Sequence, residues 1–524
     1  MDAPNPSRSA WTGFPVPDFP PLTRDLRGDV CIVGAGIAGL STAYLLGKKG
    51  RRVVVIDDGP IGSGMTGRTT AHLSSAIDDR YYELERVHGE EGSRIAYDSH
   101  MAAIEAIEAI VAHEHIDCDF ARVDGYLFIP RDGDPDELVR EYGAALRAGF
   151  EGLEFVDRAP IDAWDTGRCL RFPRQGQFHP LKYLSGLAHA IVRDGGEIYC
   201  GVHAQSIEGG EHPCVQTRGG HRIDCNAVVV ATNTPISDRL AIHTKQAPYM
   251  TYVVALRVPR GSVETALYWD TLDAYHYVRL DKPGGELLIV GGEDHKTGQA
   301  DDAERRFANL ELWARERFPM AREVAYRWSG QVMEPIDYLA FIGPDPGSRN
   351  VWIATGDSGH GMTHGTIAGI LLADLLNGGK PAWAKLYDPS RKPVKAAAEF
   401  ARENANVAWQ YTDWVRGGEV ESAENVPEGS GAVIRRGVHR IAVYRDTEGK
   451  LHEMSARCPH LGCSVHWNPA DSSWDCKCHG SRFNALGRVM MGPAVSDLAP
   501  AESPATPHVR NTRHAGGPPP AAPR

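Results

Sequence analysis

Two short cysteine–histidine motifs near the C-terminus constrain this chain more than any other feature of its sequence. They read Cys458-Pro-His460-Leu-Gly-Cys463 and Cys476-Lys-Cys478-His479-Gly-Ser481. Each motif supplies a Cys–His pair and one further cysteine. Two thiolates and two imidazoles are suitable ligands for a single metal centre. The sequence therefore predicts a metal site built from two loops.

Two kinds of metal centre fit these ligands. In a Rieske [2Fe–2S] cluster one iron binds two cysteines and the other binds two histidines, and the neutral His ligands raise the reduction potential. A tetrahedral zinc site with two cysteines and two histidines is the alternative. Zinc would explain four ligands but not the extra cysteine pair, so the cluster is favoured.

The motifs resemble those of Rieske domains of the quinol–cytochrome type, although Lys477 stands where that type usually has proline. The resemblance implies that Cys458 and Cys476 bind one iron and that His460 and His479 bind the other. It also implies that a disulfide between Cys463 and Cys478 joins the two loops.

Three further positions bear on this resemblance. Gly492-Pro493-Ala494 is similar to the proline loop that covers the cluster, and Ser481 matches a hydroxyl that donates to a cluster sulfur. Phe483 replaces the tyrosine of the highest-potential members, whose phenol also donates. We therefore expect a middling potential within the family range of roughly −150 to +300 mV.

Composition sets the broad class of the protein. A chain of 524 residues with 42% apolar and 24% charged residues is expected to form two or three globular domains. A net charge of −12 argues against nucleic acid or an anionic membrane as partner. The longest apolar runs, such as 367–376, are too short to span a bilayer. With no signal-peptide pattern and six scattered cysteines, we expect a cytoplasmic enzyme.

A glycine motif near the N-terminus predicts a dinucleotide site. Gly34, Gly36 and Gly39 follow a predicted strand (27–33) and open a predicted helix, and the next strand (52–56) ends at Asp57. This context is the Rossmann arrangement, in which the helix N-terminus binds the pyrophosphate. Asp57 is expected to bind the ribose hydroxyls, with Asp58 as the alternative.

Later segments distinguish the candidate cofactors FAD and NAD. A loop rich in glycine and hydroxyl groups covers 62–72, an apolar run with Thr232 covers 228–233, and a second strand–glycine–helix passage covers 351–376. In this order they resemble the glycine/D-amino-acid oxidase (DAO) family of FAD-dependent amine oxidoreductases. The resemblance implies FAD bound by the residues Gly34, Gly36, Gly39, Asp57, Thr66, Gly67, Thr69, Thr70, Thr232, Gly356, Asp357, Gly361, Met362 and Thr363.

The predicted fold is α/β plus β: a Rossmann-like FAD-binding domain of the glutathione-reductase-like DAO type, an interleaved α+β substrate domain, and an all-β Rieske domain. We expect a helix pair over 79–116 and an antiparallel sheet from 245 to about 327. The predicted segments are an N-terminal arm (1–26), the FAD-binding domain (27–78, 165–244 and 328–392), the substrate domain (79–164 and 245–327), a helical linker (393–420), the Rieske domain (421–509) and a disordered tail (510–524).

The substrate site is predicted less sharply than the cofactor sites. In the family that the sequence resembles, a neutral amine loses a hydride to the flavin, which requires an apolar pocket and an anchor for the charged end of the substrate. Tyr275, Tyr277 and His360 are the catalytic candidates, and His276 and Trp328 are further wall candidates. Arg279 is the candidate anchor for a substrate carboxylate, and His72 is a candidate flavin tether.

The fused cluster constrains how electrons leave the protein. Reduced FAD holds two electrons and the cluster accepts one, so reoxidation would proceed in single-electron steps. We predict a FAD-dependent enzyme that oxidises a small amine or amino-acid-like substrate and passes electrons through the cluster to an external carrier protein, quinone or oxygen. The alternatives are an electron-transfer protein that supplies a partner oxygenase and a redox sensor.

Overall fold

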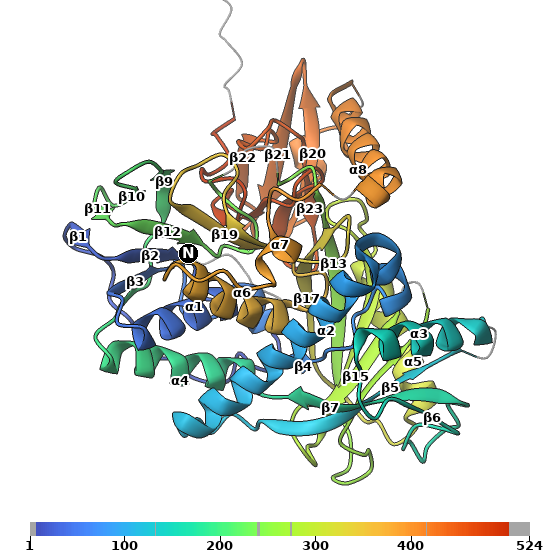
Figure 1. The fold of residues 1–524 in the computed structure, drawn as a ribbon. Helices are drawn as coiled ribbons and strands as arrows, with labels where there is room; N and C mark the ends of the chain where they lie inside the picture. Colours follow the sequence, from blue (N-terminus) through green and yellow to red (C-terminus); the bar gives the residue numbers. More distant parts are fainter. Residues whose placement is uncertain are drawn as a thin grey trace, which may run out of the picture.

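The computed structural model of this chain describes residues 7–130, 133–237, 242–272, 275–392, 394–415 and 417–501. A large α/β part holds the first three quarters of the chain, and a smaller all-β part follows helix α8 (Figure 1). The predicted tail at 510–524 lies outside the described residues. Within the described ranges, no helix combines the length and the apolar character that crossing a bilayer requires.

A six-stranded sheet forms the centre of the α/β part. Its strand order is β18-β19-β12-β2-β3-β8, with β18 antiparallel to the rest. The strands are β18 (Phe341–Pro344), β19 (Val351–Thr355), β12 (Ala227–Val230), β2 (Val30–Val33), β3 (Val53–Ile56) and β8 (Glu197–Tyr199). All residues of β2, β3 and β12 are buried, as expected for parallel strands that are covered on both faces.

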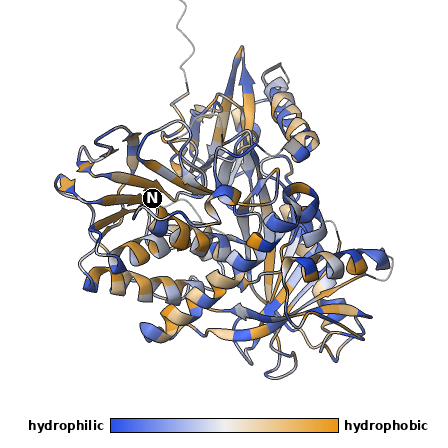
Figure 2. Ribbon diagram, viewed as in Figure 1, coloured by the Kyte–Doolittle hydropathy of each residue, from blue (hydrophilic) through white to orange (hydrophobic). Residues whose placement is uncertain are grey.

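Helices cover one face of this sheet and a small sheet covers the other. The helices are α1 (Ile37–Lys48), α4 (Pro180–Arg193) and α6 (Gly361–Leu375). The small sheet has the order β1-β11-β10-β9, from Leu26–Arg27, Arg222–Asp224, Cys214–Thr217 and Ala204–Glu208. Figure 2 shows apolar residues gathered on the strands between these layers.

A nine-stranded sheet forms the second half of the α/β part, in the order β17-β13-β16-β15-β14-β5-β7-β4 with β6 beside β7. The strands are β17 (Val324–Pro335), β13 (Gln246–Arg257), β16 (Leu287–Lys296), β15 (His276–Leu280), β14 (Leu267–Asp270), β5 (Ala121–Phe128), β7 (Cys169–Gln177), β4 (His72–Leu73) and β6 (Glu154–Val156). The antiparallel sheet predicted from 245 to 327 is present, and four strands from earlier in the chain extend it.

Helices also pack around the nine-stranded sheet. They are α2 (Tyr81–His113), α3 (Pro135–Ala148) and α5 (Ala303–Arg317). Helix α2 is interrupted at Gly89, whose φ of 76° is not helical, so the predicted helix pair is two helices joined at a glycine. Helix α5 packs against β13 and β16.

The predicted N-terminal arm is part of the core. Trp11 is 1% exposed, and its indole N–H donates to the Thr69 carbonyl over 2.6 Å. Ser9 donates to the Gly67 carbonyl, also over 2.6 Å. The arm therefore lies against the loop that precedes β4 and helps to fix it.

A linker of short helices leads to the C-terminal part. It comprises α7 (Ala384–Tyr387), η2 (Val394–Ala396), α8 (Ala397–Gln410), η3 (Tyr411–Val415) and η4 (Ala423–Asn425). Lys296 on β16 pairs with Glu403 on α8 at 2.6 Å. Beyond α8, the Trp414 indole donates to the Gly462 carbonyl over 3.0 Å. The linker thus contacts both parts of the molecule.

The C-terminal part consists of two antiparallel sheets, as predicted for this segment. One sheet is β20-β21-β22 (Ser430–Arg436, His439–Arg445 and Leu451–Ser455). The other is β23-β24-β25-β26 (Val465–Asn468, Ser473–Cys476, Arg482–Asn484 and Val489–Met491). The two cysteine–histidine motifs lie in the β22–β23 and β24–β25 loops.

Candidate functional site

A cavity of about 690 Å³ lies where the central strands of the six-stranded sheet end. The residues that follow β2, β3, β12 and β19 form one wall, and the nine-stranded sheet forms a second. Residues Arg482–Val495 of the C-terminal part contribute a third wall. Small-molecule sites usually enclose about 300–1,000 Å³, so this cavity can hold a large cofactor.

The glycine motif shapes the first wall. Gly34 has a φ of 113°, and a Cβ there would lie 2.4 Å from the Ala231 carbonyl oxygen. A Cβ on Gly39 would lie 1.8 Å from the Gly34 carbonyl oxygen, so helix α1 can approach β2 only without a side chain there. Gly36, before helix α1, has no side chain to cap it, and the Ile37 N–H donates to the Thr66 hydroxyl over 3.1 Å; Gly36, Ile37 and Ala38 line the cavity. This N-terminus suits an anionic group.

Asp57 lies at the end of β3 beside this turn. Its carboxylate accepts from the Ala35 N–H over 2.6 Å and from the Gly59 N–H over 2.8 Å. Burial raises the pKa of Asp57 to about 6, although both backbone hydrogen bonds oppose that rise. Asp58 also lines the cavity, and its Oδ2 lies 2.8 Å from Nδ1 of His203.

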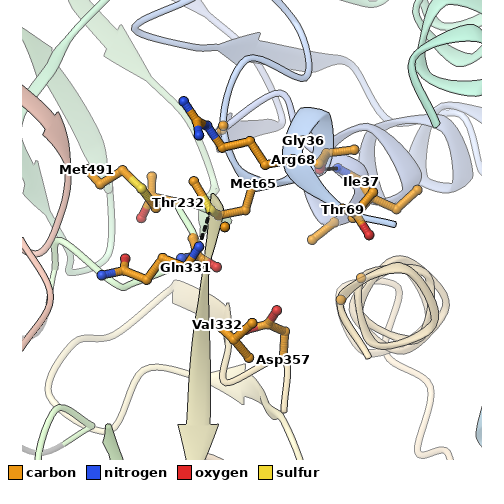
Figure 3. A pocket seen from close by; sticks show the side chains of 18 of the residues that line it. Gly36, Ile37, Met65, Arg68, Thr69, Thr232, Gln331, Val332, Asp357 and Met491 are labelled. Carbon is orange, nitrogen blue, oxygen red and sulfur yellow. Dashed lines mark hydrogen bonds between the residues drawn. The ribbon is translucent and has the colours of Figure 1, made fainter. Parts of the chain in front are cut away.

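Two more loops complete the cofactor end of the cavity. One contains η1 (Met65–Arg68), and the other connects β19 to α6, which also begins without a side-chain cap. Figure 3 shows side chains from both loops around the cavity, with the hydrogen bond from the Gln331 N–H to Sδ of Met65 at 2.9 Å. Burial raises the pKa of Asp357 to about 6.

The cavity brings together most of the residues predicted to bind the cofactor. These are Gly34, Gly36, Asp57, Thr66, Thr69, Thr70, Thr232, Gly356, Asp357, Gly361 and Met362. Gly39, Gly67 and Thr363 do not line it. The Thr363 hydroxyl lies 2.9 Å from Nδ1 of His100 behind the wall.

Several buried polar atoms point to a bound group. His72 Nε2, Asn233 Nδ2, Gln331 Oε1 and His364 Nε2 have no hydrogen-bond partner within the described part of the chain. All these residues line the cavity. Buried polar atoms normally have hydrogen-bond partners, and a polar cofactor in the cavity would supply partners for these atoms.

Aromatic side chains line the end of the cavity at the nine-stranded sheet. Tyr275 and Tyr277 lie with ring centroids 5.3 Å apart, and Trp269 from β14 lies on the same wall. The Tyr275 hydroxyl donates to Oδ2 of Asp78 over 2.6 Å. His360 lines the cavity as well, so the three predicted catalytic candidates lie together.

Asp78 and His360 influence each other's protonation. The Asp78 backbone N–H donates to Nε2 of His360 over 3.0 Å, and the same nitrogen lies 3.3 Å from Oδ1 of Asp78. Burial lowers the pKa of His360, but the Asp78 charge outweighs burial and the net pKa is raised. Burial likewise raises the pKa of Asp78, yet His360 and the Tyr275 hydroxyl bring the net pKa below its usual value. Asp78 is therefore anionic at neutral pH.

Other residues expected in the substrate wall lie elsewhere. Arg279 is fully buried outside the cavity, and its guanidinium donates to the Leu280, Ala71, Phe178 and Asp281 carbonyls. The proposal that Arg279 anchors a substrate carboxylate is therefore wrong. His276 stacks on Trp313 at 4.4 Å, and Trp328 donates to the Arg68 carbonyl, so neither lines the cavity.

The two cysteine–histidine motifs converge in the C-terminal part. Cys458 and Cys476 are each 1% exposed, and the thiol contact between them lowers the pKa of Cys458. The His460 and His479 rings lie 5.0 Å apart, and Nδ1 of His479 is buried without a hydrogen-bond partner in the described ranges. Cys463 and Cys478 form a disulfide, with Cα atoms 6.4 Å apart. Ser481 accepts from the Ala494 N–H over 3.1 Å, which ties the proline loop to this site.

A histidine from the α/β part covers the histidine side of this site. His243 is 2% exposed, and its ring centroid lies 4.9 Å from that of His460 and 5.9 Å from that of His479. The predicted histidine ligands therefore face the α/β part.

One glutamine connects the two sites directly. Gln331, on β17, lines the cavity and is 1% exposed. Its side-chain amide donates to the Gly480 carbonyl over 3.0 Å, and Gly480 follows the predicted ligand His479. A single side chain therefore separates the cavity from the second cysteine–histidine loop.

Family models match both parts of the chain. The model of FAD-dependent oxidoreductases (DAO) matches residues 29–375. The chain belongs to the DAO family of FAD-dependent oxidoreductases. The model of the Rieske [2Fe–2S] domain matches residues 417–502, so this DAO-family enzyme carries a Rieske domain at its C-terminal end.

Individual relatives agree with this assignment. The Rieske 2Fe-2S iron-sulfur protein YhfW of Bacillus subtilis is 32% identical over 93% of this chain and 96% of its own. Gamma-glutamylputrescine oxidoreductase of Escherichia coli is 28% identical over 69% of this chain and 86% of its own. Glycine oxidase from Geobacillus kaustophilus, at 21% identity and a TM-score of 0.60 over 70% of this chain and 99% of its own, shares the fold.

The residues present fit the two cofactors of these families. The uncapped starts of α1 and α6 and the unpaired polar atoms of the cavity suit FAD. The paired thiols and the unpartnered Nδ1 of His479 suit a [2Fe–2S] cluster with mixed ligands. Sequence reasoning did not identify Asp78 and His243, because which wall a side chain faces depends on the packing of segments that are distant in sequence.

Proposed function

We propose that this DAO-family enzyme oxidises a C–N bond of an amine or amino-acid-like substrate and passes the electrons singly through its Rieske cluster to an external acceptor. Two similarities support the substrate chemistry. One relative is a gamma-glutamylputrescine oxidoreductase, and one protein of the same fold is a glycine oxidase. FAD supplies the two-electron oxidation when bound, and the cluster supplies a one-electron outlet.

The residues of the first cavity wall would hold FAD. The N–H groups at the start of α1 would bind the pyrophosphate, and Asp57 would accept from the ribose hydroxyls. The start of α6, with Gly361 and Met362, would face the flavin ring. Cys458, His460, Cys476 and His479 would hold the cluster, and the Cys463–Cys478 disulfide would keep its two loops together.

The substrate would lie between the flavin and the aromatic end of the cavity. Tyr275 and Tyr277 would position it, and the apolar ring faces would favour the uncharged amine, which is the form that releases hydride. His360, whose Nε2 accepts from the Asp78 N–H, would close the cavity wall beside the tyrosines. External acceptor and cytoplasmic location remain predictions from the sequence.

The contact of Gln331 carries the electron-transfer proposal. It donates to the cluster loop at Gly480 while lining the FAD cavity, so the two cofactors would sit on opposite sides of one residue. Because intervening atoms are few, electrons would pass between the cofactors without movement of the Rieske domain.

Anaerobic reduction by substrate tests this proposal. Electron paramagnetic resonance should show the reduced cluster appearing as the flavin absorbance bleaches. A Gln331→Leu variant should keep flavin reduction and slow cluster reduction, because it removes the link to Gly480.

Gln299→Leu is the matched control, since Gln299 bonds to Asn406 and approaches the Lys477 carbonyl without lining the cavity. If the cluster stays oxidised while FAD bleaches and oxygen rapidly reoxidises the flavin, the electron path through the cluster is wrong.

A further inference from the structure

Oxidation of a C–N bond releases protons as well as electrons. A substrate that loses one hydrogen from carbon and one from nitrogen gives up two electrons and two protons. In the proposed function, both electrons leave singly through the cluster on the far side of Gln331. The two protons therefore need an outlet of their own from a cavity that three protein walls surround.

Ser358, in the loop between β19 and α6, contacts two carboxyl groups at once. Its Oγ lies 3.0 Å from Oε2 of Glu334 and 3.0 Å from Oδ2 of Asp79. Glu334 belongs to β17 and lines the cavity. Asp79, just before α2, is half-buried and does not line the cavity. The three side chains therefore form a row of hydrogen-bonding groups that leads from the cavity through its wall.

The backbone fixes the position of Ser358. Its φ of 44° lies in the left-handed region, which residues with a side chain rarely adopt. Its N–H donates to the Met333 carbonyl over 3.1 Å, and the residue is 1% exposed. A conformation of this kind persists only where the surrounding structure holds it. Here it places the hydroxyl between the two carboxyl groups.

The hydrogens of this row can be counted. The Ser358 hydroxyl has one hydrogen to donate, and an ionised carboxylate has none. Two ionised carboxylates would therefore leave one of the two contacts without a hydrogen. A proton on either carboxyl group supplies the missing one, because that group then donates to Ser358 while Ser358 donates to the other. Such a row can pass a proton along when each hydrogen moves to the next oxygen.

The surroundings favour a proton on this pair. Burial raises the pKa of Asp79 to about 7, and the charge of Asp78 adds to the rise. Burial also raises the pKa of Glu334 well above its usual range, and the charge of Asp79 is the next cause. The other charged groups that act on the pair are Asp357, which raises the pKa of Glu334, and His360 and Arg80, which oppose the rise at Asp79. The pair therefore keeps a proton at neutral pH.

We propose that Glu334, Ser358 and Asp79 form a proton relay that carries the protons of substrate oxidation from the cavity to solvent. This inference rests on the proposed function. In each turnover a CH–NH unit becomes C=N, two electrons pass through the cluster to a one-electron acceptor, and two protons pass in turn along the relay. Glu334 would give its proton to Ser358 as the Ser358 hydrogen moves to Asp79, which releases a proton to water. Glu334 would then take up the next proton from the cavity.

Proton release during reoxidation tests the relay without a substrate. The holoenzyme is photoreduced anaerobically and mixed with ferricenium, a one-electron acceptor, in weakly buffered solution with phenol red. Flavin absorbance and proton release are then followed together, and in the wild type they should keep pace. Ser358→Ala keeps both carboxyl groups but removes the oxygen between them. Its proton release should be slower by about a hundredfold, the lower end of what a positioned proton-transfer group contributes.

Matched variants separate the relay from general effects of substitution. Ser185→Ala should release protons like the wild type, because Ser185 is buried, donates to a carbonyl of its own helix α4 and does not line the cavity. Glu334→Gln and Asp79→Asn should slow release as the relay serine does. Glu141→Gln, which changes a buried carboxyl group away from the cavity, should not. The flavin and cluster spectra report whether each variant is intact.

Mixtures of H2O and D2O test the wild type alone, so the result does not depend on how the variants fold. Two hydrogens move together in the relay, one from a carboxyl group and one from the Ser358 hydroxyl. The rate constant of proton release should therefore fall along a curve as the deuterium fraction rises. A straight line, or the same rate in both solvents, would contradict the relay.

The outcomes separate the two proposals. If Ser358→Ala releases protons as fast as the wild type, the relay is wrong and amine oxidation stands. If no amine or amino acid reduces the flavin of the wild type, amine oxidation is wrong. The ferricenium experiment still reports on the relay in that case, because it involves no substrate.

Discussion

Burial shifts the pKa of several carboxyl groups of the α/β part upward, toward neutral pH. Burial raises the pKa of Asp57 and Asp357 to about 6 and that of Asp79 and Glu141 to about 7. Asp79 gains a further rise from the charge of Asp78. Uptake of protons by such groups links the stability of the fold to pH.

Glu141 on α3 gives a prediction at the scale of one residue. It accepts from the Tyr81 N–H over 2.7 Å, which a glutamine could also do. Its folded pKa of about 7 exceeds the unfolded value of 4.5, so the folded state binds the extra proton between these pH values. Stability from Glu141 is therefore lost as pH rises from the unfolded to the folded pKa.

Glu141→Gln should remove this loss. Between pH 5 and pH 7.5, the free energy of unfolding of the variant should rise by about 2–3 kcal/mol relative to that of the wild type. Each unit of pKa difference corresponds to about 1.4 kcal/mol. Urea denaturation of both proteins at the two pH values measures the difference. If the free energies of unfolding of the two proteins differ by the same amount at both pH values, Glu141 titrates with its ordinary pKa.

The convergence of the two cysteine–histidine motifs and the turn at the glycine motif could be predicted from sequence, because local spacing determines their geometry. Gly34, Gly36 and Asp57 belong to one short strand–turn–helix passage. By contrast, Asp78 and Tyr275 are distant in sequence, and their hydrogen bond forms only once the whole chain has folded. Arg279 looked like an anchor from its residue type, yet its direction depends on the Ala71 and Phe178 carbonyls, which are distant in sequence.

Glycines on neighbouring strands create the aromatic wall of the cavity. Tyr277 on β15 pairs in register with Gly291 on β16, and a Cβ there would lie 2.2 Å from the tyrosine ring. Trp269 on β14 similarly lies over Gly125 on β5, where a Cβ would be 2.5 Å from the indole. Because Gly291 and Gly125 have no side chain, the rings of Tyr277 and Trp269 can lie directly against the neighbouring strands and face the cavity.

Gly291→Ala should move Tyr277 and impair substrate binding. The ring cannot stay within 2.2 Å of a methyl group, so we expect KM to rise by about tenfold or more. The cluster signal should be unchanged, since Gly291 and Tyr277 belong to the nine-stranded sheet and not to the Rieske domain. Steady-state kinetics and the cluster spectrum of the same sample measure both effects.

Gly47→Ala provides the comparison. Gly47 lies within α1, and a Cβ there would meet nothing within 4 Å. Alanine is the better helix former by about 1 kcal/mol, so this variant should be as active as wild type and no less stable. Equal impairment of both variants would contradict the role given to Gly291.

The strands and helices themselves were largely predictable. Apolar runs indicated β2 and β3, and periodicity indicated α2. The N-terminal arm was not recognised as core, because a proline-rich segment with one tryptophan carries no periodic pattern. Trp11 is held by residues that are distant in sequence: its indole donates to the Thr69 carbonyl, and its ring lies 4.9 Å from that of His179.

A buried network of charged side chains joins the Rieske domain to the α/β part. Asp471 pairs with Arg68 at 3.1 Å and with Arg482 at 2.6 Å, and it accepts from the Ser329 hydroxyl over 2.7 Å. Both arginines bring the pKa of Asp471 far below its usual value, outweighing burial. The interface therefore holds the Rieske domain in one orientation.

Asp471→Ala should lower the free energy of unfolding of the whole molecule. It leaves two buried guanidinium groups short of a partner, which typically costs about 3–5 kcal/mol. Glu304→Ala removes the exposed partner of Arg327 and should cost at most about 1 kcal/mol. Thermal unfolding of the two holoenzymes compares them, and similar losses would mean that the Asp471 network is not a main support of the interface.

The position of Arg482–Val495 at the cavity has a consequence for biosynthesis. This wall is made last, after the rest of the FAD cradle has left the ribosome, and domains generally fold from the N-terminal side first. The flavin would thus enter while its compartment is still open, and the arriving Rieske domain would close it. Cells short of riboflavin should then accumulate a form whose C-terminal domain is not docked against the α/β part. Iron shortage should leave the flavin in place.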